Sequence, residues 1–394
     1  MLKDPKTLLE EEMVCFHSRS RLAETTLGIG VSISRLPRTG EIRNVEASLD
    51  LLCMRAFQKQ HVRKSISGHS FTHWLPLYFG ESKNYETKKQ FFNDAKGCYE
   101  YEVKQVNPRE RMITLLKKSL VFLTKGSTKK EYTSSMVLET MPKLIITHLV
   151  SMVEGQKHIS LTAIRRLVNF IRLFRLLIEL SPEVETEING KLQEFIATPD
   201  KRIKDHCSSL GDLLAFVLIS NKVHLKELLE AYLEEQLDRQ AFWIIRSIPE
   251  LDHTDEKNKG REIILEESRN EVCFKTGLVG FHMTLIFFSL CESMESMYKK
   301  DMGKLCIDLD DNFGCLNLKV EADLQKKFQA ITRVDNFNKY YKWLGIDCPD
   351  AQALTTRLRK AIDNSRAKKY HGGNEINELP TLAEQTTTFL DREP

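Results

Sequence analysis

From about residue 107 onward, the apolar side chains of this chain recur at the spacing of an α-helix. After Ser160, which suits the N-cap position, they stand three or four residues apart: Leu161, Ile164, Leu167, Val168, Ile171, Phe174 and Ile178. This spacing places them on one helix face, which a core would cover. The same pattern predicts helices near residues 209–220, 223–235, 237–247, 261–274, 276–298, 321–333, 336–344 and 351–370. The chain is therefore predicted to be mainly α, as an irregular multi-helix bundle or an α-solenoid-like array.

A shorter periodicity precedes the helices. Residues 27–34 alternate apolar and small polar side chains, a Pro- and Gly-containing turn follows, and a second short run begins at Ile42. Two such runs around a turn predict a β-hairpin over residues 27–45. Ser48 then suits the N-cap of a helix from Leu49 to about Lys64.

These patterns predict three parts. We expect an N-terminal α+β element over residues 1–80, a helical domain over residues 81–371 and a flexible tail over residues 372–394. The tail contains Gly372, Gly373 and Pro380 and is predominantly polar, a composition typical of segments without fixed structure.

The longest apolar stretch runs from Thr276 to Cys291. It is shorter than the roughly 20 residues that cross a bilayer, so it predicts a buried core helix and no transmembrane insertion. The chain begins with charged residues where a signal peptide would be apolar, and its nine cysteines are irregularly spaced. These features predict reduced thiols in a cytoplasmic or nuclear protein.

The net charge argues against a dedicated nucleic-acid-binding protein. The chain carries 58 basic and 55 acidic side chains, a formal charge of +3, whereas nucleic-acid binders usually show a strong basic excess. One alternative stays open. The predicted helix over residues 354–369 is basic and would suit an acidic membrane surface or a nucleic acid, with strongly salt-dependent binding.

Metal and cofactor motifs are incomplete throughout the sequence. No two pairs of Cys or His ligands have the spacing of a zinc site. The acidic loop that starts at Asp308 has Phe313 where a calcium loop needs glycine, and Lys319 where it needs glutamate. The Gly28–Gly30 pair is followed by Ile33 where a dinucleotide-binding loop has its third glycine. We therefore predict no metal and no cofactor.

Cys207 is the one candidate nucleophile. It follows Lys204 and His206 and lies just before a strongly apolar helix. Cationic neighbours and a helix N-terminus would favour its thiolate, with His206 as the polarising group. The alternative is that Ser208 or Ser209 caps the helix and Cys207 only packs.

Five side chains are candidates for binding a partner. Arg165 and Arg172 are seven residues apart and lie on one stripe of a predicted helix, where they could meet an acidic partner; the alternative is a solvated face with internal salt bridges. His73, Trp74 and Tyr78 fall in a non-helical aromatic segment that could line a groove. The alternative for these three is that they anchor a loop on a core.

Six segments form an ordered set that resembles a known family. They read LGIGVSISRLPRTGEI, SGHSFTHWLPLYFG, MVLETMPKLIITHLV, LVNFIRLFRLLIEL, SSLGDLLAFVLIS and LEEQLDRQAFWIIRSIPEL. This set resembles the helical region that accompanies ubiquitin-conjugating domains in large proteins of invertebrates and protists. It covers residues 27–371 and consists of core and turn positions.

The resemblance implies a helical companion of a ubiquitin-conjugating fold without its chemistry. The chain has neither the His-Pro-Asn tripeptide that precedes the active cysteine of such folds nor the paired Cys/His framework of RING ligases. The predicted function is therefore a non-enzymatic scaffold or adaptor for protein partners, with a ubiquitin-pathway protein among them. A cysteine-dependent, ubiquitin-type transferase that uses Cys207 is the alternative.

Overall fold

The structure is a computed structural model. It describes residues 131–154, 159–260, 263–298, 301–311 and 315–370, the strands 27–35, 42–53 and 73–76, and short stretches between residues 37 and 124. The chain divides into two compact units. The first comprises Met1–Ile145, Ser160–Val184 and Lys300–Ala322, and the second comprises Ile146–Ile159, Glu185–Lys299 and Asp323–Pro394. The three predicted domains stay a prediction, and the predicted tail over residues 372–394 lies outside the described residues.

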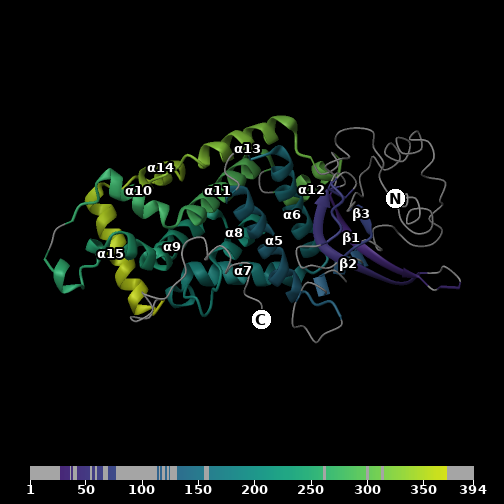
Figure 1. The fold of residues 1–394 in the computed structure, drawn as a ribbon, viewed down its shortest axis with the longest axis horizontal. Coiled ribbons are helices and arrows are strands. Elements are labelled where there is room, and N and C mark those ends of the chain that lie inside the picture. Colours follow the sequence, from purple (N-terminus) through teal and green to yellow (C-terminus); the bar gives the residue numbers. More distant parts are fainter. Residues whose placement is uncertain are drawn as a thin grey trace. The chain divides into compact units, whose positions relative to one another are not determined.

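Helices dominate the described residues (Figure 1), so the mainly α prediction is confirmed. They are α5 (Ser135–Glu154), α6 (Leu161–Glu179), α7 (Pro182–Ala197), α8 (Leu210–Ile219), α9 (Leu225–Ser247), α10 (Glu267–Lys275), α11 (Leu278–Tyr298), α12 (Met302–Asp311), α13 (Leu318–Ile331), α14 (Phe337–Trp343) and α15 (Ala351–Ala367). Short 3-10 turns η2 (Pro199–Lys201), η3 (Pro249–Leu251) and η4 (Glu256–Asn258) join some of them.

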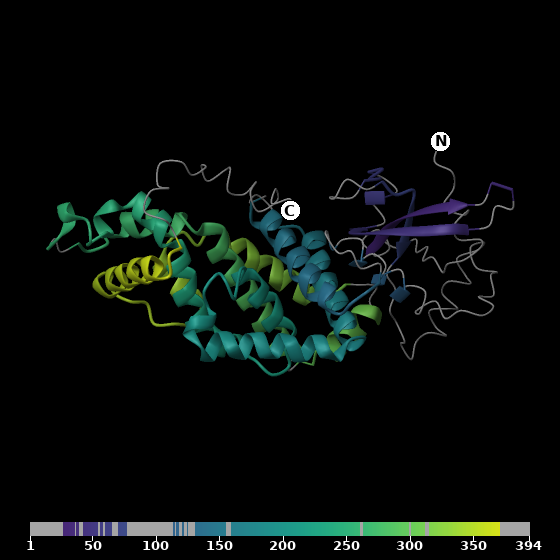
Figure 2. The same ribbon diagram turned by 90° about the horizontal axis from the view of Figure 1, so that it is seen from below.

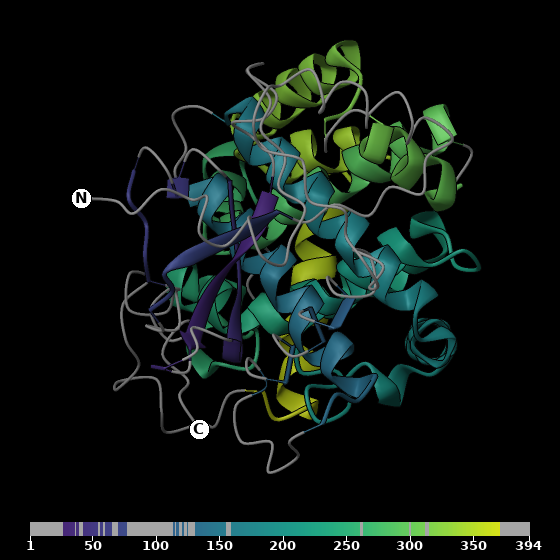
Figure 3. The ribbon, with the colours of Figure 1, turned by 90° about the vertical axis from the view of Figure 1, so that its right-hand side faces the viewer.

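An antiparallel sheet belongs to the first unit. Its strands are β1 (Leu27–Arg35), β2 (Ile42–Cys53) and β3 (His73–Pro76), in the order β2-β1-β3. The purple arrows of β1 and β2 run side by side in Figures 2 and 3. The hairpin predicted over residues 27–45 falls on these two strands. The helix predicted from Leu49 does not start there, because β2 continues to Cys53.

Gly30 lets an aromatic ring approach the sheet closely. A Cβ at this position would overlap the ring of Phe71, which is buried. That ring stacks on Phe57 with 6.2 Å between centroids, and the Arg63 guanidinium lies 3.7 Å from the Phe57 centroid. Only glycine therefore fits at Gly30 unless Phe71 moves.

Helices α6 and α12 pack together in the first unit. The predicted cap of α6 is confirmed, since the Ser160 hydroxyl accepts a hydrogen bond from the Ala163 amide at 3.1 Å. The apolar face predicted for this helix is also buried, with Ile164, Leu167 and Phe174 fully enclosed. Helical spacing alone thus identified the residues that α6 contributes to the core.

The second unit is built on α9. Helices α8 and α10 contact α9, and α15, the yellow ribbon in Figure 1, packs along it. Helix α11 contacts α8, α10 and α14. The centre of this packing is a cluster of aromatic rings whose neighbouring centroids lie 4.7–6.3 Å apart: Phe274, Phe281, Phe337, Tyr340 and Tyr341.

Two described helices, α5 and α11, are long and apolar enough to cross a membrane by length and composition alone. Of their apolar windows, 50% and 56% are buried inside the protein. In α11 the buried side chains include Phe281, Leu285 and Phe287, which pack in the core of the second unit. Core packing therefore accounts for the apolar stretch after Thr276.

Candidate functional site

A groove of about 610 Å³ lies in the second unit beside α9, the end of α14 and α15. Leu229, Leu233 and Leu237 line it at four-residue intervals, so they follow one another along one face of α9. These leucines are buried, while Lys226 and Glu230 beside them are exposed. The α9–α15 groove, as we call it, thus combines an apolar floor with charged edges. Its remaining lining residues are Glu234, Asp238, Tyr341, Leu344, Gly345, Ile346, Arg357, Lys360, Ala361 and Asn364.

The groove has the dimensions of a peptide site. The lining residues of α9 extend over three turns, which corresponds to a length of about 18 Å. Its volume lies within the range of roughly 300–1,000 Å³ that is usual for ligand pockets. An amphipathic segment can place side chains three or four residues apart on such a row of leucines. The shape and chemistry of the groove therefore suit an amphipathic helix of a few turns or a short extended segment.

The ends of α14 and α15 use the same backbone motif. After α14, Gly345 has a positive φ of 67°, and the Ile346 amide donates to the Tyr341 carbonyl at 3.0 Å. After α15, Lys369 has a positive φ of 55°, and the Tyr370 amide donates to the Ser365 carbonyl at 3.1 Å. Both are Schellman ends, in which glycine is the usual residue at the left-handed position. The lysine in the second case holds a conformation that disfavours side chains.

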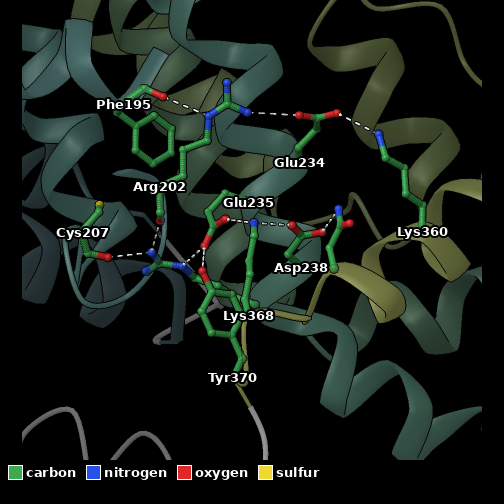
Figure 4. Close-up of polar contacts among 11 residues, drawn as sticks. Phe195, Arg202, Cys207, Glu234, Glu235, Asp238, Lys360, Lys368 and Tyr370 are labelled. Carbon is green, nitrogen blue, oxygen red and sulfur yellow. Dashed lines mark hydrogen bonds and ion pairs between the residues drawn. The ribbon is translucent and has the colours of Figure 1, made fainter. Parts of the chain in front are cut away.

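The end of α15 brings cationic and phenolic groups to buried acids of α9 (Figure 4). The Lys368 ammonium donates to a carboxylate oxygen of Glu235 at 2.6 Å and to one of Asp238 at 2.7 Å. The Tyr370 hydroxyl donates to the other oxygen of Glu235. The Glu235 side chain is 0% exposed and that of Asp238 is 4% exposed. The two carboxylates are thus compensated from the residues that end α15.

Arg239 joins the same network to the loop that precedes α8. Its Nε donates to Glu235 at 2.8 Å, and its Nη2 donates to the carbonyl oxygens of Cys207 at 2.6 Å and Arg202 at 2.9 Å. Arg202 in turn reaches Glu234 at 3.2 Å, and Glu234 faces Lys360 at 3.5 Å (Figure 4). Because Glu234, Asp238 and Lys360 line the groove, this ion network forms one of its sides.

Burial and the contacts between charged groups together shift the pKa values in the network. Burial raises the pKa of Asp238 despite the nearby Lys368, and it raises the pKa of Tyr370, to which the hydrogen bond and negative charge of Glu235 add. Burial alone would lower the pKa of Lys368, but its contacts with Asp238 and Glu235 outweigh this and raise it. The raised pKa values extend to higher pH the range in which Lys368 is cationic and Tyr370 is neutral.

The structure places Cys207 in an environment unlike that of a nucleophile. Burial raises the pKa of its thiol to about 11, against the opposing effect of the Arg239 charge. The thiol lies 3.6 Å from the Ser209 carbonyl, its hydrogen-bond acceptor, while the His206 side chain is exposed. Ser209 caps α8 by accepting from the Asp212 amide. The geometry thus matches the alternative, in which a serine caps the helix and Cys207 packs.

Arg165 and Arg172 belong to the interior of the first unit. Arg165 makes two hydrogen bonds to Glu321, at 2.9 Å and 2.7 Å, and this pair raises the pKa of the guanidinium. Arg172 is only 6% exposed. Arg175, on the same helix, pairs with Glu179 at 3.4 Å. Of the two alternatives weighed for these arginines, internal salt bridges describe Arg165 and Arg175, and neither Arg165 nor Arg172 presents an open surface.

The three aromatic candidates remain predictions. His73 and Trp74 lie on β3, opposite Val31 and Gly30 of β1, and their side chains lie outside the described part of the structure. Tyr78 lies wholly outside the described residues.

The basic stretch over residues 354–369 pairs largely with acids of its own unit. Arg366 contacts Asp252, Lys368 contacts Glu235 and Asp238, and Lys360 contacts Glu234. Arg357 lies 5.6 Å from the centre of the Tyr341 ring. These contacts reduce the charge available to a membrane or nucleic acid.

Among the residues that the structure describes, no group of three or more His, Cys, Asp or Glu could hold a metal ion.

Sequence reasoning overlooked the groove and the ion network. A usable signal was the four-residue spacing of Leu225, Leu229, Leu233 and Leu237, which continues across the break predicted between residues 235 and 237. Comparison with known proteins adds no further guide, since no family model, no curated protein and no solved structure matches the chain.

Proposed function

We propose that this chain is a non-enzymatic helical scaffold that binds protein partners through the α9–α15 groove. The observation that carries the proposal is the row of Leu229, Leu233 and Leu237 beneath charged edges. The helical body would be the predicted irregular bundle or α-solenoid-like array. Its partners would be cytoplasmic or nuclear proteins, with a ubiquitin-pathway protein among them.

The charge around the groove specifies the kind of segment it would bind. The groove and its ion network contain six basic and four acidic side chains. The basic ones are Lys226, Arg357, Lys360, Arg202, Lys368 and Arg239, and the acidic ones are Glu230, Glu234, Asp238 and Glu235. Three of the basic side chains, Lys226, Arg357 and Lys360, line the groove itself and favour an amphipathic segment with acidic residues beside its apolar face. The apolar face would cover the leucines, and the acidic residues would meet Lys226 and Arg357.

Site-specific photocrosslinking in cells tests the proposal. A photoreactive residue at Glu230, which lines the groove, is compared with one at Glu227, which is exposed on the same helix and does not line it. We expect a discrete adduct from position 230, at a yield well above that from position 227. The double substitution Arg357→Glu with Lys360→Glu should reduce the adduct yield at position 230, because these two exposed residues form the basic edge of the groove on α15.

Two outcomes bear on different parts of the proposal. Equal yields at positions 230 and 227, or a yield insensitive to the double substitution on α15, would contradict the groove as the binding surface. If the adducts depend on the groove but contain no ubiquitin-pathway protein, the proposed link to the ubiquitin pathway is wrong, while the proposed scaffold function stands. Binding of the purified partner to the chain, with the same dependence on Arg357 and Lys360, completes the test.

A further inference from the structure

The C-terminal part of the chain starts from the residues that end α15. Lys368 and Tyr370 are fixed to Glu235 and Asp238 of α9. Asp238 lines the groove and accepts a hydrogen bond from Asn364, another lining residue, at 3.3 Å. The end of α15 therefore lies beside the α9–α15 groove, with Tyr370 held on Glu235, the neighbour of the lining residue Glu234.

The sequence beyond Tyr370 has the chemistry that the groove selects. Residues 374–385 read NEINELPTLAEQ and contain three acidic and no basic side chains. Its apolar residues Ile376, Leu379 and Leu382 recur every third position. The segment thus combines apolar and acidic side chains, and the groove presents leucines with Lys226, Arg357 and Lys360 along its edges.

The chain can reach the groove from Tyr370. Five residues lie between Tyr370 and Ile376, and the six residue steps of an extended chain span about 20 Å. The groove itself is about 18 Å long. Gly372 and Gly373 stand at the start of this connection, where glycine permits the chain to reverse direction. Attachment at the end of the groove also gives the segment a high effective concentration there.

We propose that residues 374–385 dock in the α9–α15 groove of the same chain. Ile376, Leu379 and Leu382 would cover the leucines of α9, and Glu375 and Glu378 would face Arg357 and Lys360. The inference rests on the proposed function in one respect, since the segment would occupy the groove in competition with a protein partner. A partner would then have to displace the tail before it binds.

Photocrosslinking within the purified full-length chain tests the docking. A photoreactive residue replaces Thr381, which lies between two of the apolar positions, and a matched one replaces Thr388, beyond the segment. We expect position 381 to crosslink to peptides of α9 and α15, in monomeric protein, about tenfold more than position 388. The charge reversal Glu375→Lys with Glu378→Lys should abolish this preference.

Reversing the charges on both sides of the proposed contact separates a loss of docking from a loss of folding. Arg357→Glu with Lys360→Glu should also abolish the preference, and combining both pairs of reversals should restore it. Equal crosslinking from positions 381 and 388, crosslinks away from the groove, or crosslinks only between two chains would overturn the docking. Because no partner is present, this result is independent of the crosslinking at Glu230 in cells.

Discussion

Two buried glutamates, one in each compact unit, are held in different ways. Glu321, on α13, receives both hydrogen bonds of Arg165 and a third from the Leu316 amide at 3.1 Å. Glu235, on α9, receives Arg239 together with Lys368 and Tyr370 from the end of α15. The Arg165–Glu321 pair is enclosed in the first unit. The Glu235 network borders a groove and the start of the C-terminal tail.

The groups that hold the two glutamates differ in whether they titrate, and this difference indicates different roles for the two glutamates. A buried pair whose donors are a permanently charged guanidinium and a backbone amide has no group that changes near neutral or alkaline pH. The Glu235 network depends on an amine and a phenol beside the groove. We infer that Arg165–Glu321 holds the fold of its unit, while the Glu235 network fixes one side of a binding surface.

The largest effect should follow the loss of Arg165. Arg165→Met leaves the Glu321 side chain, which is 1% exposed, without its cation. Breaking a buried ion pair in this way costs about 3–5 kcal/mol. Native-state hydrogen exchange of α6 and α13 should report this loss.

The double variant Arg165→Met with Glu321→Gln provides the control. It removes the charge as well as the cation and keeps an acceptor for the Leu316 amide, so most of the stability should return. If Arg165→Met alone changes the exchange of α6 by less than a factor of ten, the pair does not hold the first unit.

A smaller effect is expected at Lys368. Lys368→Met leaves Glu235 with Arg239 and Tyr370, and the lysine side chain is itself 22% exposed. Asp238 also loses its cation, but burial already raises its pKa, so that it can take up a proton while it keeps the hydrogen bond from Asn364. A hydrogen bond to a charged group contributes about 1.5–3 kcal/mol, so we expect a loss near the lower figure, confined to α9 and α15. Hydrogen exchange should show no change in α6. An equal loss in both units would contradict the contrast between the two glutamates.

Alkaline pH should act selectively on the Glu235 network. The raised pKa values of Lys368 and Tyr370 mean that the folded state keeps their protons longer than the unfolded state. Their contribution is present below about pH 10, near the unfolded pKa values, and disappears as pH rises through the folded ones. Exchange of α15 should accelerate relative to α6 above pH 10. Lys368→Arg with Tyr370→Phe should flatten this dependence, and an unchanged slope would refute the assignment.

The smallest effect, that of Lys369→Gly, concerns one of the two Schellman ends. Lys369→Gly should stabilise the second unit by at most about 1 kcal/mol, because glycine adopts positive φ without strain. Gly345→Lys should destabilise it by about 1–2 kcal/mol, since a side chain there has space but an unfavourable backbone. Urea denaturation of both variants measures these two changes in the free energy of unfolding. Effects of the same sign would show that side-chain contacts, and not backbone conformation, determine these ends.

The sequence predicted helices better than it predicted their interruptions. Helices expected at residues 209–220, 276–298 and 336–344 correspond to α8, α11 and α14. Helix α9, however, was predicted as two pieces with a break after Glu235. The acids Glu235 and Asp238 interrupt its apolar pattern. Arg239 pairs with Glu235 from one turn away, but Lys368, which pairs with both acids, lies more than 120 positions later. Local spacing cannot reveal such partners.

The N-terminal region shows the opposite error. The segment from Val45 to Leu51 alternates apolar and polar residues, a strand pattern, and β2 includes all of it. Ser48 as a helix cap was given more weight than this alternation. The candidate site was missed for a related reason. A groove depends on α9, α14 and α15 coming together, whereas the arginines of α6 stood out in the sequence because their neighbours are apolar.

The α9–α15 groove is the proposed binding surface for an acidic amphipathic segment. The direct measurement is methyl NMR of Leu229, Leu233 and Leu237 in the full-length variant with Glu375→Lys and Glu378→Lys, titrated with a synthetic peptide of residues 374–385. Binding in the groove predicts saturable shifts at these three leucines and none at Leu309 of the first unit. Unchanged groove leucines at saturating peptide would contradict it.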